Sequence, residues 1–453
     1  MTTSDLQPLP KTPAVSGVLE ALSFLRDPNF ATSRFERYGD VYETVLFGQS
    51  QVFVRGERAI SDLFAQADRL EGWWPGSVRE LLGPFSLANR HGPAHKARRR
   101  VVGQLFSAAA IQRYTPSIVA LVDDLCADLA AATAPVALAD RMRRFAFTVI
   151  ASTVLGLNAE DRQALFVDFE IWTKGLFALP LPFPWSALAR ARAARQRLLK
   201  RLAEVLRQAQ ATAASGKSLG VGGLDLLAGG LDEAGLPLTD DDVVEQLLLL
   251  LFAGYETTAS SLTCLMLALL RHPEQLAWLR QELDTLSWPP ELQSGTPPGG
   301  AARYAATGGP RLDAMVKEVM RLTPPVGGFF RRTRAPIQLA GFAVPADRVV
   351  QVSLAATHRL GDPADDLEVF RPRRHLEDGC SAMLLPFGGG ERVCLGKALA
   401  EAEIRLLAVG LLQQIDCELV ADQDLSLAII PSPTPKSGLQ VRASRRGSSG
   451  AGG

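Results

Sequence analysis

The sequence predicts a mainly α-helical protein with small β-sheets, an α+β fold, and three observations lead to this class. Helical periodicity dominates several segments along the chain, one apolar segment is far longer than a strand, and strand-like alternation occurs in only two regions. The chain has 453 residues, of which 47% are hydrophobic, so it has enough apolar material for a large buried core.

Five segments rich in Ala, Leu and Arg have apolar residues at helical spacing, namely 107–132, 188–212, 273–286, 312–321 and 394–414. Strand-like residues occur at 41–54, on either side of Phe47-Gly48, and at 337–352, where turns are expected near Gly341 and Pro345.

Residues 1–443 are expected to form a single domain. The stretch 287–310 is rich in Gly and Pro and predicts a surface loop, while 444–453 predicts a disordered tail. No glycine-rich nucleotide fingerprint opens a helix after a strand, so a fused reductase is not expected.

The longest apolar segment, 247–270, contains Glu256 as its only formal charge and is long enough to cross a bilayer. Polar residues cluster in its middle, where an isolated span would tolerate them least, so we expect a buried central helix and no transmembrane segment. Thr239 before three aspartates predicts a capped, acidic start, and His272-Pro273 predicts the end. A membrane span remains the alternative.

Charge and cysteine usage exclude several classes of protein. Lys plus Arg equals Asp plus Glu at 48 each, which gives no reason to expect nucleic-acid binding. The five cysteines are scattered and lack CxxC spacing, so neither a disulfide framework nor a zinc site is predicted. Residues 1–13 lack the pattern of a signal peptide, and a cytoplasmic location is expected.

The segment 386–396, with the sequence PFGGGERVCLG, carries the main functional signal. An inert cysteine after a glycine-rich loop is the ordinary interpretation of such a segment. A thiolate bound to haem iron would instead need backbone N–H donors around sulfur and a positive potential. Glycines allow a tight backbone there, and Cys394 stands where the predicted helix 394–414 begins.

Phe387, Gly390, Arg392, Cys394 and Gly396 together resemble the haem-binding signature of the cytochrome P-450 family. The resemblance implies heme b, iron protoporphyrin IX, with Cys394 as the axial metal ligand and Phe387, Arg392 and Gly396 as further cofactor-binding residues. It also implies the family's triangular helical domain, with a long central helix over the haem.

A second group of residues resembles the family's structural network. Glu318 and Arg321 match its E-x-x-R motif, and Arg374 follows in the pattern Phe370-x-Pro372-x-Arg374. The pair could equally be a solvated salt bridge on an exposed helix. His375 departs from the aromatic residue that usually follows the arginine.

Two sites resemble those that bind the haem propionates in the family. His95 and Arg99, spaced i and i+4, match an H-x-x-x-R pair, although the run around them could be an ordinary basic helix face. Arg331 matches a strand arginine, and the adjacent Arg332 is the alternative for that role.

Residues 253–258 of the central helix resemble the family's oxygen-activation motif. Small Ala253 and Gly254 would leave space beside the iron, with a local widening of the helix. Thr257 is expected to hydrogen-bond the oxygen, and Glu256 to supply protons. A packing patch of small residues is the alternative.

The segments 74–83 and 174–182 resemble the retinoic-acid-hydroxylating branch of the family and its soluble bacterial relatives. The resemblance implies a small apolar substrate such as a retinoid, a carotenoid fragment or another terpenoid. Candidate pocket residues are Arg79, for a carboxylate, and the apolar residues Phe177, Leu181, Phe330 and Ile430. Arg79 could equally be solvated or face a propionate, and the stretch 177–185 could be ordinary core.

The function expected from these motifs is a haem-thiolate monooxygenase that inserts one oxygen atom from O2 into an apolar substrate. Electrons would come from a separate ferredoxin or flavodoxin that docks on basic residues such as Arg98, Arg100 and Lys397. Oxidation of fatty acids, a non-catalytic haem sensor and an electron carrier are the alternatives.

Overall fold

A computed structural model describes residues 7–13, 20, 23–24, 27, 30–46, 48–179, 181, 183–215, 223–289, 309–377, 381 and 383–447. The chain forms two compact units, each built from two separate segments: 1–74 with 320–394, and 75–319 with 395–453. Because neither unit is continuous in sequence, neither corresponds to a linear domain. The single domain over 1–443 stays a prediction.

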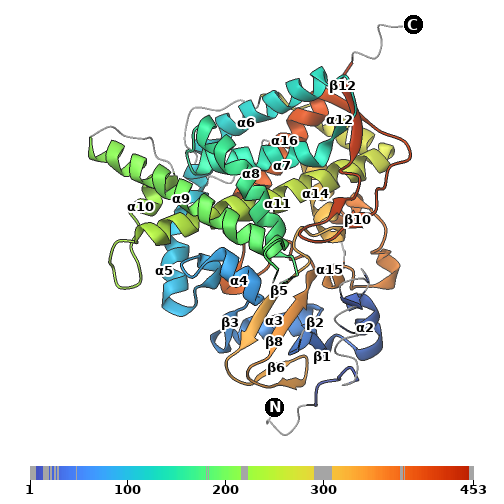
Figure 1. The fold of residues 1–453 in the computed structure, drawn as a ribbon. Coiled ribbons are helices and arrows are strands. Elements are labelled where there is room, and N and C mark those ends of the chain that lie inside the picture. Colours follow the sequence, from blue (N-terminus) through green and yellow to red (C-terminus); the bar gives the residue numbers. More distant parts are fainter. Residues whose placement is uncertain are drawn as a thin grey trace. The chain divides into compact units, whose positions relative to one another are not determined.

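The first unit is built on a five-stranded sheet with the order β1-β2-β8-β5-β3. Its strands are β1 (Val41–Leu46), β2 (Gln49–Val54), β3 (Leu70–Gly72), β5 (Gly328–Thr333) and β8 (Val349–Ser353) (Figure 1). Only β2 and β8 run parallel, with Val52 opposite Val350. A hairpin of β6 (Ile337–Leu339) and β7 (Phe342–Val344) lies between β5 and β8 in sequence. Both predicted strand regions are confirmed, although Phe47 lies outside the described residues.

Alternating residues of the strands pack on opposite faces of this sheet. Val52 and Val54 join a core with Ile60 and Leu63 of α3 (Glu57–Ala65). Aromatic residues fill the other core, where Phe30 and Phe35 of α2 (Phe30–Tyr38) pack with Tyr42 and Phe53. A short helix, α15 (Leu354–Thr357), follows β8.

The second unit is mainly helical. Its helices are α4 (Gly76–Leu82), α5 (Gly92–Gly103), α6 (Ala108–Ala131), α7 (Leu138–Thr148), α8 (Ala159–Leu176), α9 (Ala187–Ala214), α10 (Gly223–Ala228), α11 (Asp240–Arg271), α12 (Pro273–Leu283) and α16 (Lys397–Gln414). The helix α14 (Pro310–Leu322) contains the boundary between the units. Small antiparallel sheets pair β4 (Val136–Ala137), β12 (Gln440–Arg445) and β9 (Ile415–Leu419), and β10 (Leu427–Ala428) with β11 (Thr434–Pro435).

The central helix α11 has the predicted boundaries. Thr239 caps it by accepting a hydrogen bond from the N–H of Asp242 at 3.2 Å, and the helix ends before His272. It packs against α7, α9 and α16 (Figure 1). Although α11 is long and apolar enough to span a membrane, 72% of its apolar stretch is buried in the protein, as is typical of a core helix.

Two predictions about the C-terminal region need correction. Ser444 and Arg445, placed in a disordered tail, pair with Asp416 and Ile415 in the β12–β9 ladder, because their backbone groups find partners there. The helix expected from 394 begins at Lys397, so Cys394 lies in the loop before it. Residues 448–453 of the predicted tail and 290–308 of the predicted loop lie outside the described residues.

Candidate active site

The loop that contains Cys394 is a tight turn of defined geometry. The N–H of Gly388 donates to the carbonyl of Leu385 at 2.9 Å, and the N–H of Cys394 donates to the carbonyl of Phe387 at 3.0 Å. Gly388 and Gly390 have φ values of 68° and 65°, a conformation that glycine adopts without strain. Cys394, Cys126 and Cys264 are all free cysteines, but Cys394 is exposed whereas the other two are buried. The loop therefore presents its thiol rather than burying it as core.

Two partly buried arginines, Arg331 and Arg392, lie close together at this loop. Gly72 on β3 pairs with Arg331 on β5, and a Cβ atom on Gly72 would come within 2.7 Å of Cζ of Arg392. Burial, together with the positive charge of Arg392, lowers the pKa of the Arg331 guanidinium to about 10. Two neighbouring guanidinium groups that are partly shielded from water favour a bound anion, which would offset both the desolvation and the repulsion. These residues fit a carboxylate-bearing cofactor.

The two adjacent arginines of β5 have different surroundings. The guanidinium of Arg331 lies 4.6 Å from the ring centroid of Phe329 and donates to the carbonyl of Phe330 at 2.8 Å. Arg332 is exposed and forms an ion pair with Asp347 at 3.0 Å. Of the two candidates, Arg331 is the one that faces Arg392 rather than solvent.

The predicted structural network is a buried set of donors and carbonyls. Glu318, Arg321 and Arg374 are each at most 1% exposed, so they are not the solvated pair that was the alternative. Arg321 donates to the carbonyls of His358 at 3.1 Å and Leu367 at 2.6 Å. Arg374 donates to the backbone carbonyls of Asp365, Asp366 and Val369 at 2.5, 3.0 and 2.9 Å. These bonds fix the backbone of the segment 365–369.

His358 connects this network to the cysteine loop and was not predicted as a site residue. Its carbonyl accepts from Arg321, and its Nε2 accepts from the N–H of Leu385 at 3.0 Å. The imidazole is fully buried, and burial lowers the pKa of His358 to about 4. The neutral form is the one that can accept this hydrogen bond. No spacing pattern in the sequence marks a contact across 27 residues.

The lowered pKa of His358 predicts acid sensitivity. Its folded-state pKa lies below the unfolded value, so protonation favours unfolding: the contribution is complete above about pH 6.5 and is lost as the pH falls through 4. The shift corresponds to about 3 kcal/mol in the free energy of unfolding. Urea unfolding between pH 7 and 4 should reveal a loss of this size relative to the variant His358→Gln, which keeps an acceptor but does not titrate. An identical pH dependence in both proteins would contradict the assignment.

On α11, the two small residues of the predicted oxygen motif have different surroundings. Ala253 is exposed, and its carbonyl accepts from Oγ1 of Thr257 at 2.8 Å. A Cβ atom on Gly254 would lie 2.4 Å from Cγ1 of Ile150, so Gly254 is required for close packing rather than for an open space. The predicted widening of this helix is also wrong: α11 is α-helical throughout, and the π-helical segment is its neighbour Val149–Val154.

Glu256 is buried on α11, whereas Ala253 is exposed. Its carboxylate lies 3.3 Å from Nη2 of Arg143 on α7. Burial lowers the pKa of Arg143, but the charge and hydrogen bond of Glu256 more than offset this effect, and the pKa is raised. The partner of this buried acid is therefore a cation, the guanidinium of Arg143.

The helix α5 carries both His95 and Arg99, with His95 buried and Arg99 partly buried. Arg98 between them was predicted to lie on a docking face and does not: it is 3% exposed and forms ion pairs with Asp242 and Glu233. Arg100 and Lys397, the other two docking candidates, are exposed.

The candidate substrate residues belong to both units. In the second unit, Phe177, Leu181 and Ile430 are 41%, 49% and 60% exposed, and Arg79 is exposed on α4. This exposure contradicts the alternative that 177–185 is ordinary core; Pro180 and Pro182 lie outside the described residues. In the first unit, the ring of Phe330 packs edge to face on Trp73 at 5.4 Å.

The comparison with known proteins identifies the family of this fold. The family model for Cytochrome P450 matches residues 10–438, which contain every predicted site residue. The chain belongs to the cytochrome P450 family. It is 34% identical to cytochrome P450 120 of Synechocystis sp. over 97% of this chain and 98% of that protein. It is 33% identical to human cytochrome P450 26B1 over 92% of this chain and 83% of that protein.

A solved P450 structure, described as retinoic acid bound cyanobacterial CYP120A1, matches with a TM-score of 0.86. The two chains are 33% identical, and the match covers 97% of this chain and all of that one. This P450 is thus a monooxygenase that uses a haem, O2, a small apolar substrate and a source of electrons. The predicted family, fold class and enzyme class are confirmed.

Proposed function

We propose that this P450 hydroxylates a long apolar molecule with one polar end, of the retinoid or carotenoid-fragment type, at a distance from that end. The observation that carries the proposal is the similarity, at 33% identity over 97% of this chain, to a structure solved with retinoic acid bound. Oxidation of a fatty acid is the competing possibility, since it has the same overall chemistry.

The cofactor in this proposal is heme b, which activates O2 for insertion into a C–H bond. Cys394 would bind the iron, within the turn formed by Phe387, Arg392 and Gly396. Arg331 and Arg392 would bind propionates, a role supported by their proximity and by the lowered pKa of Arg331. His95 and Arg99 are proposed for the same carboxylates.

Thr257 and Glu256 are proposed to deliver protons. The hydroxyl of Thr257 donates to Ala253, so its oxygen lone pairs can still accept a hydrogen bond from water or from an acid. Glu256 would take up a proton after it leaves Arg143, and this exchange of partners would limit how often it delivers one.

Thr257→Val tests this role without a change in side-chain shape. Substrate binding should persist, but the amount of product per O2 consumed should fall by about tenfold, with peroxide or water formed instead. Thr257→Ser retains the hydroxyl and is the matched control. Equal product yields per O2 in Thr257→Val and the wild type would exclude Thr257 from proton delivery.

Apolar burial would provide most of the substrate affinity, at roughly 25 cal/mol per Å2 removed from water. Phe177, Leu181, Phe330 and Ile430 are proposed to contact the chain of the substrate. Arg79 is proposed to bind the carboxylate.

A titration distinguishes the substrate classes. Retinoic acid, retinol and a fatty acid of similar length are added to purified protein, and the low-spin to high-spin shift of the haem is followed. Retinoic acid should shift the spectrum at the lowest concentration. If the fatty acid acts at a lower concentration than both retinoids, the substrate proposal fails and the monooxygenase class is unaffected.

Electron supply is proposed to come from a separate ferredoxin or flavodoxin in the cytoplasm. Arg100 and Lys397 would contribute positive charge to docking, while Arg98 is excluded by its burial against Asp242. High salt should therefore slow reduction.

A further inference from the structure

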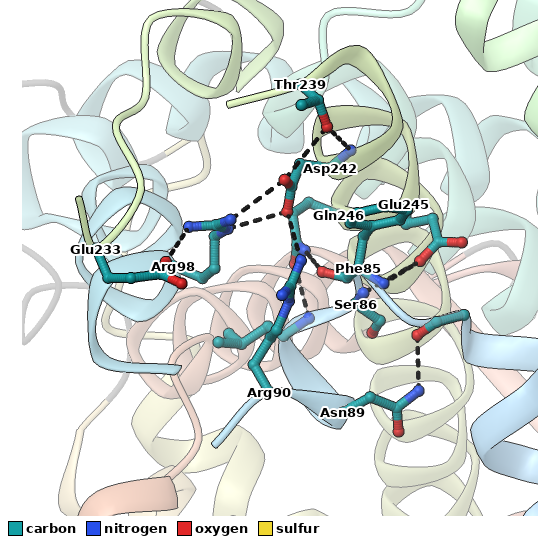
Figure 2. Close-up of polar contacts among 12 residues, drawn as sticks. Phe85, Ser86, Asn89, Arg90, Arg98, Glu233, Thr239, Asp242, Glu245 and Gln246 are labelled. Atoms are coloured by element: carbon teal, nitrogen blue, oxygen red, sulfur yellow. Dashed lines mark hydrogen bonds and ion pairs between the residues drawn. The ribbon is translucent and has the colours of Figure 1, made fainter. Parts of the chain in front are cut away.

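Side chains of α11 bind the backbone of the segment between α4 and α5. Oε2 of Glu245 accepts from the N–H groups of Phe85 at 2.7 Å and Ser86 at 3.2 Å. Oε1 of Gln246 accepts from the N–H of Leu87 at 3.1 Å, and its Nε2 donates to the carbonyl of Phe85 at 2.5 Å. Figure 2 shows both side chains pointing from the helix toward this segment. Three consecutive amides are thus bound by two neighbouring residues.

An ion pair with a partly buried arginine fixes Glu245 in place. Its other oxygen accepts from Arg195 of α9, and Nε of Arg195 donates to the carbonyl of Leu81 at 2.9 Å. Glu245 is 5% and Gln246 is 1% exposed. Gly83 has a φ of 92°, and a Cβ atom there would lie 2.2 Å from Oε1 of Glu245, so the chain must be glycine to approach so closely.

A second ion cluster binds the end of the same segment one turn earlier on α11. Asp242 accepts from Arg90 at 3.1 Å and from Arg98 at 3.0 and 3.2 Å, and Arg98 also reaches Glu233 (Figure 2). Three acids and three arginines therefore balance across the two clusters. Moving the segment between α4 and α5 away from α11 would leave buried charges without partners, which is costly in free energy.

We propose that Glu245 and Gln246 are positioning residues for substrate recognition, acting through the backbone of 85–87. The segment connects α4, which carries Arg79, to α5, which carries His95 and Arg99. Because the contacts are to its backbone, they hold the end of α4 and the start of α5 in position independently of the side chains in the segment. The proposal rests on the proposed function for the role of Arg79.

The same helix also carries Thr257, twelve residues after Glu245, about 18 Å along its axis. One rigid element thus positions both the residue proposed for proton delivery and the segment that presents the carboxylate-binding arginine. We expect loss of the α11 contacts to weaken recognition of an acid more than that of the corresponding alcohol.

The test compares Gln246→Leu and Glu245→Gln with the wild type. Gln246→Leu removes one acceptor and one donor, whereas Glu245→Gln keeps an oxygen acceptor but loses the charge that pairs with Arg195. The control is Glu80→Gln, which breaks the exposed Arg192–Glu80 pair between α4 and α9 without touching the segment. Each variant must retain the ferrous-carbonyl spectrum of the wild type.

Two readouts are measured on the haem-loaded full chain. Hydrogen exchange of the peptide containing Phe85, Ser86 and Leu87 should be faster by about tenfold or more in Gln246→Leu, less so in Glu245→Gln, and unchanged in Glu80→Gln. The preference for the acid is measured as the Kd of the alcohol divided by the Kd of the acid, both from the spin shift. This ratio should fall by about tenfold in Gln246→Leu and by a smaller factor in Glu245→Gln.

Unchanged exchange at 85–87 would overturn the proposal. Faster exchange with equal weakening of acid and alcohol would also overturn it, because the two residues would then be purely structural. If the wild type prefers a fatty acid, the proposal of retinoid hydroxylation fails. The role of Glu245 and Gln246 is then tested by measuring the same ratio with the fatty acid and its alcohol. A wild type with no preference for an acid would remove the role of Arg79 and overturn the proposal.

Discussion

Replacement of Cys394 by His is expected to abolish the red-shifted Soret band of the ferrous-carbonyl form. A neutral imidazole cannot donate electron density to iron as a thiolate does. The loop should survive the change, because its turn is made by backbone bonds from Gly388 to Leu385 and from Cys394 to Phe387. Haem should still bind, so the loss is one of ligation rather than of folding.

The matched control for this experiment is Cys417→Ser on β9, whose partly buried thiol has a pKa raised by burial to about 12. This thiol is not suited to metal ligation, and the variant should keep the spectrum of the wild type. Survival of the red-shifted band in Cys394→His would contradict the ligand assignment.

Arg321→Leu is expected to cost on the order of 3–5 kcal/mol of the free energy of unfolding. The change removes the donor for the carbonyls of His358 and Leu367, and it leaves Glu318 buried with one cation fewer in its helix. Because His358 also binds Leu385, the damage should spread to the cysteine loop. Urea unfolding and the fraction of chains that incorporate haem measure the two effects.

Arg332→Leu is the control for this prediction, since it breaks an exposed pair with Asp347 and should change stability by less than about 1 kcal/mol. Arg321→Lys keeps the charge, but a single ammonium group cannot reproduce the planar fork that reaches several carbonyls, so it should resemble Arg321→Leu. Normal stability in both Arg321 variants would show that the network is dispensable.

Much of the fold could be predicted because the elements concerned carry local signals. Thr239 caps α11 as expected, and α6 and α9 have boundaries within a few residues of their predicted ranges. The helices α7 and α8 were not predicted. Long-range packing explains α8: Phe169 and Trp172 are buried among aromatic residues of other helices. Periodicity within one segment cannot detect such contacts.

The sequence by itself determined the chemistry of the site, because a motif such as Phe387-to-Gly396 specifies residue types at fixed spacing along one turn. Only the tertiary structure decided which polar groups meet across the fold. It pairs Arg98 with Asp242, directs Arg331 rather than Arg332 toward Arg392, and packs Gly254 against Ile150. The reason is physical: spacing shows which face of a helix or strand a residue occupies, but the cost of burying charge depends on the partners that other segments supply.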